Sequence, residues 1–205
     1  MTINLFEQFV VLWVVIDPIG TIPVFTAVTA GLSPAQQRKT ALQAALVAAG
    51  VLLFFLVLGQ FLIDALGISL PAFQIAGGLV LFLFALTMIF ADTGKESEPS
   101  EDDNPAIFPL AVPSLASPGA MLAIVLLTDN YRFSVPEQVV TAGVMVSVLA
   151  VAFLFMLAAT PILKVIGRTG AAIVSRVMGM ILAAVAVDNV IEAIVQLIRD
   201  GLPAV

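Results

Sequence analysis

The sequence predicts an all-α integral membrane protein of six transmembrane helices, arranged as a 3+3 inverted repeat with helices 1 and 4 broken near the membrane midplane. Three observations predict this fold. The 205 residues are 61% hydrophobic and only 11% charged, a composition outside the range of water-soluble domains. Six apolar segments are each long enough to cross a bilayer. Proline and glycine interrupt the first and the fourth of them at corresponding positions.

The six apolar segments run approximately over 5–30, 41–63, 72–91, 106–128, 139–163 and 173–198. Ser33 or Pro34 is expected to open the second helix, because serine caps helices and proline suits their first position. We interpret residues 1–205 as a single membrane domain, with a first three-helix repeat (1–91) and a second (105–205). The intervening 92–104 is predicted to be an acidic cytoplasmic linker, because it is rich in Ser, Pro and acids (Glu96, Glu98, Glu101, Asp102 and Asp103).

An internal repeat supports this division. Residues of the same type recur one hundred positions apart, and those of the third and sixth segments recur at a spacing of one hundred and one. The pairs are Pro18 and Pro118, Phe55 and Phe155, Gly67 and Gly167, then Gly78 and Gly179, Leu81 and Leu182, Ala85 and Ala186. The order of features repeats too: an interrupted segment, a plain one and a small-residue one. Because three is odd, the second half must cross the membrane inverted, as in many secondary transporters.

The positive charges predict an orientation. Six lysines and arginines follow the first, third and fifth segments, and two lie on the opposite side. The first group is Arg38, Lys39, Lys95, Lys164, Arg168 and Arg176, and the second is Arg132 and Arg199. Since cytoplasmic loops carry the excess of positive charge, both termini are expected to be extracytoplasmic.

The interruption of the first segment contains Asp17, Pro18, Gly20 and Thr21. An aspartate followed by a proline is typical of a helix start, so a second half-helix is expected to begin at Asp17. The fourth segment repeats this order with a serine as the cap, in Ser114, Ser117, Pro118 and Gly119. Each interruption is therefore predicted to offer the N-terminus of a half-helix deep in the membrane.

These eight residues form the predicted substrate-binding site. Free N–H groups at a helix start suit a carboxylate, whereas orphan carbonyls and the Asp17 carboxylate suit an ammonium group. Gly20 and Gly119 have no side chain to shield their backbones, so a ligand is expected to approach closely. The predicted ligand is thus a small zwitterion such as glycine or alanine. The alternative is a pair of capped proline kinks with a structural role only.

Ion coupling is the second predicted property of the site. Asp17 could carry a coupling ion or serve only as a satisfied N-cap. Asp188, inside the sixth segment, could carry a proton, line the pathway or bond a neighbouring helix. Proton and sodium coupling both remain open. Histidine and cysteine are absent from the sequence, so neither a metal nor another cofactor is expected, and nothing indicates nucleic-acid binding. The expected partners are an amino acid and membrane lipid, and the oligomeric state is open.

At these stretches the sequence resembles the MarC family, also called the neutral amino acid transporter family of six-span membrane proteins. The resemblance runs from Phe6 to about Ile198. Its most specific parts are Asp17-Pro18-Ile19-Gly20 with Pro23 and Phe25, Ile75-Ala76-Gly77-Gly78 with Leu81, and Pro109-Leu110-Ala111-Val112-Pro113 leading to Pro118-Gly119. It implies transport of small neutral amino acids across the inner (plasma) membrane of a bacterium or archaeon. Thr21 stands where this family usually has Asn, Ser117 where it has Gly, and Asp188 where it has an uncharged amide.

The same residues are compatible with other functions. A passive channel or facilitator would also use broken helices, and efflux of another small solute fits the same plan. An intramembrane enzyme would need Asp17 and Asp188 as a dyad, but the chain has no Gly-x-Gly-Asp or Gly-x-Ser-x-Gly sequence. The prediction is therefore a secondary transporter working by alternating access, and not an enzyme.

Overall fold

The computed structural model describes residues 4–29, 31–90 and 104–200, and every regular element in these ranges is helical. The elements are α1 (Leu5–Ile16), α2 (Thr21–Val28), α3 (Pro34–Ala65), α4 (Leu70–Phe90), the irregular π-helical segment η1 (Ala106–Leu115), α5 (Pro118–Leu127), α6 (Val135–Leu157) and α7 (Ala159–Asp200). The predicted all-α class is confirmed. The predicted acidic linker lies almost wholly outside the described residues.

In the described part of the chain, four helices are long and apolar enough to cross a membrane: α3, α4, α6 and the Arg176–Arg199 part of α7. A fifth crossing arises if η1 and α5, which are bent by 52° relative to each other, count as one span. The 12 residues of α1 cover only about 18 Å at 1.5 Å per residue, too little for a bilayer core. The protein is therefore a multi-pass integral membrane protein.

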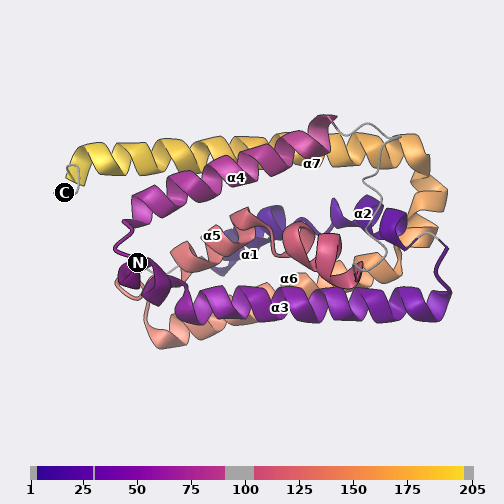
Figure 1. The fold of residues 1–205 in the computed structure, drawn as a ribbon, viewed down its shortest axis with the longest axis horizontal. Coiled ribbons are helices and arrows are strands. Elements are labelled where there is room, and N and C mark those ends of the chain that lie inside the picture. The colour runs from indigo at the N-terminus through magenta and orange to yellow at the C-terminus, as the bar shows by residue number, and fades with distance from the viewer. Residues whose placement is uncertain (1–3, 30, 91–103, 201–205) are drawn as a thin grey trace.

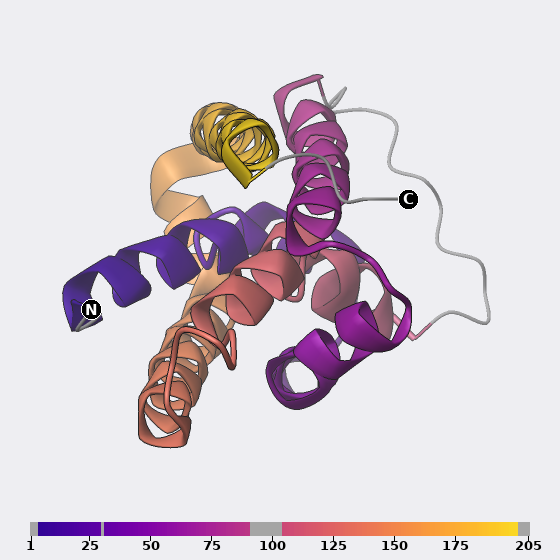
Figure 2. The ribbon, with the colours of Figure 1, turned by 90° about the vertical axis from the view of Figure 1, so that its left-hand side faces the viewer.

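The long helices lie along one axis of the molecule in three layers (Figure 1). The helices α4 and α7 run side by side along one flank, and α3 and α6 lie along the opposite flank. Between these pairs lie the four short elements α1, α2, η1 and α5, and the view along the axis gives the same order (Figure 2). The start of α1 and the end of α7 lie at the same end of the molecule. The two interrupted stretches thus occupy the interior.

The starts of the long helices follow from local capping chemistry. Ser33 caps α3 as predicted, because its side chain accepts a bond from the Gln36 N–H while the Gln36 side chain accepts one from the Ser33 N–H. This cap lets α3 begin at Pro34, seven residues before the apolar segment that predicted it.

The structure also differs from the prediction at the fifth and sixth segments. The helix α7 already begins at Ala159, inside the predicted fifth segment, and Gly167 breaks its course with a φ of 68°.

The core divides into a large cluster around the short elements and a small one between α4 and α7. The small cluster consists of Leu81, Ala85, Leu182 and Ala186, all essentially buried. The two helices touch closely there. A Cβ added at Gly78 would lie 3.0 Å from the Ala186 carbonyl oxygen, and one added at Gly179 would lie 3.0 Å from the Ala85 carbonyl oxygen. Small residues thus let the backbones approach, as is common between membrane helices.

Candidate functional site

The first interruption separates α1 from α2. Asp17 ends α1 in the left-handed region (φ 50°), and its N–H donates to the Trp13 carbonyl. A helical conformation is disfavoured for Asp17 because the next residue is Pro18. The second helix begins at Thr21 and not at Asp17, which corrects the predicted boundary. The Asp17 carboxylate nevertheless caps the turn between them, since its Oδ1 accepts a bond of 2.9 Å from the Gly20 N–H.

The second interruption covers the proline-rich stretch of the fourth apolar segment, including Pro109 and Pro113. Within η1, Phe108 and Val112 have extended backbone angles, and each of them precedes a proline. The following helix begins as predicted, with Ser117 as its N-cap and Pro118 in its first turn. Ser117 Oγ accepts a bond of 3.0 Å from the Ala120 N–H. Both interruptions thus end in the same cap, in which a side-chain oxygen accepts from the N–H three residues later.

The two interruptions contact each other directly. Thr21 Oγ1 and Ser114 Oγ lie 3.2 Å apart, within hydrogen-bond distance. Ser117 Oγ donates a bond of 2.8 Å to the Val15 carbonyl, in the last turn of α1. Asp17, Thr21, Ser114 and Ser117 are all buried, with at most 7% of each residue exposed. Residues about one hundred positions apart therefore form one polar junction inside an apolar core. We call Val15, Asp17, Thr21, Ser114 and Ser117 the junction.

The caps decide which backbone groups the junction can still offer. A helix start leaves its first N–H groups without partners in the helix, and proline has none to offer. The N–H groups of Gly20 and Ala120 are taken by the capping side chains. Among the described residues, the N–H groups of Ile19 and Gly119, one position earlier, donate to no acceptor. Each interruption therefore retains one donor of this kind, together with the positive end of the short helix after it.

The two glycines of the predicted site are packed, in contrast to the expectation that a ligand approaches their backbones. A Cβ added at Gly20 would meet the Asp17 carboxylate and lie 2.9 Å from Met88 Cε. One added at Gly119 would lie 2.6 Å from Leu81 Cδ2. Side chains of this chain itself thus occupy the space beside both glycines. Of the remaining predicted residues, Pro18 is buried and Pro118 is half-buried.

The structure does not bring Asp188 into the junction. Asp188 lies exposed on α7, and no hydrogen bond or ion pair connects it to another residue in the described part of the chain. A role for it in ion coupling stays a prediction. No group of three or more acidic side chains that could hold a metal ion occurs among the described residues.

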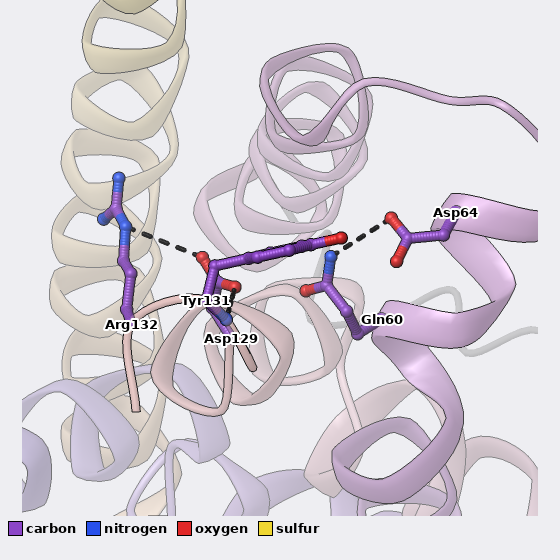
Figure 3. A network of polar contacts seen from close by, with 5 residues as sticks. All are labelled: Gln60, Asp64, Asp129, Tyr131 and Arg132. Atoms are coloured by element: carbon purple, nitrogen blue, oxygen red, sulfur yellow. Dashed lines mark hydrogen bonds and ion pairs between the residues drawn. The ribbon is translucent and has the colours of Figure 1, made fainter. Parts of the chain in front are cut away.

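A polar network that the sequence did not predict lies at the ends of α3 and α5 (Figure 3). Asp129 is only 4% exposed, accepts a bond of 2.9 Å from the Tyr131 N–H and lies 3.6 Å from the Arg132 guanidinium. Nearby on α3, Gln60 Nε2 donates to Asp64 Oδ1 over 3.3 Å. The signal in the sequence for this network is an acid, Asp129, placed directly after the fourth apolar segment (106–128).

Comparison with known proteins assigns the chain to a family. The family model described as MarC family integral membrane protein matches residues 3–198. A UPF0056 membrane protein of Archaeoglobus fulgidus is 30% identical over 93% of this chain and 92% of its own length. The UPF0056 inner membrane protein YhgN of Escherichia coli is 31% identical over 90% and 93%, respectively. No solved structure matches. A match of this extent, on a chain whose long helices are those of a membrane protein, leaves one conclusion: the chain belongs to the MarC family of integral membrane proteins.

Proposed function

We propose that this protein is a secondary transporter that moves small neutral amino acids, of the size of glycine or alanine, across the inner membrane by alternating access. The substrate site of the proposal is the junction. The observation that carries it is the contact between the two interruptions, through Thr21 with Ser114 and Ser117 with Val15. Irregular backbone at membrane depth is tolerated only where protein or water surrounds it, and such paired interruptions are the usual substrate site of inverted-repeat transporters.

The chemistry of the junction fits a zwitterion. The N–H groups of Ile19 and Gly119 stand at the positive ends of two short helices and suit a carboxylate. The Val15 carbonyl and the Asp17 carboxylate suit an ammonium group. In a buried site both kinds of group lower the cost of transferring a charged ligand from water. Ser114 and Thr21, which bond each other, can each turn a hydroxyl to a ligand.

The proposal includes six crossings in a 3+3 inverted repeat, with helices 1 and 4 broken near the midplane. The packing of α4 against α7 supports it. Gly78 faces Ala186 and Gly179 faces Ala85, which is the reciprocal contact that a two-fold axis between the repeats requires. The directions of the helices in Figure 1 agree with this plan, since α1 with α2 runs opposite to η1 with α5.

The test is glycine and alanine flux in proteoliposomes, with a matched pair of variants. The substitution Thr21→Val removes a hydroxyl that donates to the Asp17 carbonyl four residues back. The same hydroxyl also contacts Ser114, across the two interruptions. The control Thr141→Val removes another buried hydroxyl, which in α6 bonds only the Glu137 carbonyl four residues back. We expect Thr21→Val, Asp17→Asn and Gly119→Leu to change uptake, and Thr141→Val to leave it close to wild type. Unchanged uptake in Thr21→Val, Asp17→Asn and Gly119→Leu alike would refute the site.

The same vesicles separate a carrier from a passive channel or facilitator, and from efflux of another small solute. A carrier gives saturable uptake that unlabelled substrate on the opposite side accelerates, because the loaded site returns faster than the empty one. A channel gives unitary currents or unsaturable flux without this acceleration. A protein that exports another solute would move neither glycine nor alanine in either direction.

A further inference from the structure

We propose that the network at the ends of α3 and α5 is a second binding site, which takes a small monovalent cation between Gln60 and Asp129. The cation is either dissolved sodium or the primary ammonium group of an organic solute, since both present a compact positive charge. The site lies apart from the junction and does not depend on the proposed transport of amino acids.

The first ground is an amide oxygen without a partner. Gln60 is only 8% exposed, and its Oε1 is buried without any hydrogen bond in the described structure. The orientation of the amide is fixed, because its Nε2 must face the Asp64 carboxylate to which it donates. An unsatisfied buried acceptor costs about 1–3 kcal/mol, so its retention calls for a ligand that supplies positive charge or a donor.

The second ground is the place at which this oxygen points. In Figure 3, the Gln60 amide oxygen is directed to the side where the Asp129 carboxylate lies. The two helices touch just before this point, since a Cβ added at Gly59 would collide with Val125, and Thr128 Oγ1 reaches the Leu56 carbonyl at 3.5 Å. A cation placed between these two acceptors would be attracted to both of them.

The third ground is the charge of the surroundings. The helices α3 and α5 both end here (Figure 1), and the end of a helix carries a partial negative charge. Asp64 and Asp129 add two carboxylates. The one cation in the network, Arg132, has a side chain that is 59% exposed and pairs with Asp129 at 3.6 Å, so solvent screens most of its effect. The two carboxylates thus outweigh the one screened arginine, and the excess of negative charge attracts a small cation.

The experiment uses Tyr131 as its reporter. Tyr131 is the only tyrosine of the chain, and its N–H donates to the Asp129 carboxylate. Incorporation of 3-fluorotyrosine therefore gives a single ¹⁹F resonance, next to the proposed site. The purified full chain is titrated with sodium chloride, methylammonium chloride and glycine, and choline chloride keeps the ionic strength constant. We expect a saturable shift with at least one small cation and none with choline. A response to sodium alone identifies the dissolved ion, and a response to methylammonium and glycine without sodium identifies an ammonium group.

Variants decide whether the shift comes from the proposed groups. We expect Gln60→Met and Asp129→Asn to weaken binding about tenfold or more, since each removes an acceptor of a charged ligand. The substitution Gln60→Glu keeps an oxygen in place and is expected to bind at least as tightly as wild type. The control is Gln74→Met, because Gln74 is equally buried but donates to Glu192 between α4 and α7. The absence of any saturable shift in wild type would overturn the proposal, as would binding by the Gln60→Met and Asp129→Asn variants as tight as that of wild type.

Discussion

The hydrogen bond from Ser117 to the Val15 carbonyl gives a quantitative test of the junction. Ser117 and Ser33 both precede a proline, and both accept a bond from the N–H three residues later as caps of a helix. They differ in surroundings. Ser33 is exposed, whereas Ser117 is 1% exposed and also donates 2.8 Å to a carbonyl of the other interrupted segment. Replacing each serine by glycine therefore compares a cap alone with a cap that also joins the two halves of the chain.

Glycine at an N-cap costs only a few tenths of a kcal/mol relative to serine, so Ser33→Gly is expected to lower the free energy of unfolding by about that amount. Ser117→Gly also leaves the buried Val15 carbonyl without a partner, which adds about 1–3 kcal/mol. The expected difference between the two variants is thus at least about 1 kcal/mol.

The assay is equilibrium unfolding in mixed micelles, titrated with a denaturing detergent. It is followed by the fluorescence of Trp13, the only tryptophan, whose ring packs against Phe9 and Phe155. Flux in proteoliposomes, measured on the same preparations, relates the loss of stability to transport. Equal losses for Ser33→Gly and Ser117→Gly would mean that the bond to Val15 does not hold the interruptions together, and the junction would lose its main support.

Three further predictions concern packing and orientation. Gly78→Ala is expected to lower the free energy of unfolding by about 1–3 kcal/mol, because the new methyl would lie 3.0 Å from the Ala186 carbonyl oxygen. Gly143 has open space around it, so Gly143→Ala is expected to raise the free energy of unfolding by up to about 1 kcal/mol. In the same assay, Leu81→Ala should lower the free energy of unfolding by about 2–5 kcal/mol, because Leu81 is fully buried. Leu83→Ala should lower it much less, because Leu83 is 62% exposed. Equal losses of stability would mean that the contact between α4 and α7 is not formed. A reporter fused after Val205 should be found outside the cytoplasm, and a cytoplasmic signal would contradict the orientation inferred from lysine and arginine.

The parts of the fold that could be predicted from the sequence are those set by local chemistry. Ser33 and Ser117 cap helices because serine, followed by proline, suits that position whatever packs around it. The interruptions follow from proline, which removes a donor and restricts the residue before it. The latter restriction keeps Asp17 out of the helical region, and it gives Phe108 and Val112 their extended backbone angles.

Features decided by tertiary packing could not be predicted in this way. The burial of Asp129 depends on the close approach of α3 and α5 at Gly59, which no local pattern encodes. The exposure of Asp188 depends on which face α7 turns to α4, and that face is set by the small residues at the crossing. Similarly, the sequence indicated that Gly20 and Gly119 would lie close to something, but not that side chains of the same chain would fill the space.

The junction also sets a condition on how the proposed transporter could open. The two bonds between the interruptions involve neutral hydroxyls, and bonds of this kind contribute about 0.5–1.5 kcal/mol each. Breaking both therefore costs about 1–3 kcal/mol, within the range in which a minor conformation is populated and a ligand can shift the balance. A zwitterion can replace what is lost, since its ammonium group donates to the Val15 carbonyl in place of Ser117. Both bonds depend on the hydroxyls of Thr21 and Ser117. Replacing these two residues by Asn and Gly, which the resemblance to the family implies at these positions, should therefore change the preference between glycine and alanine in the proteoliposome assay.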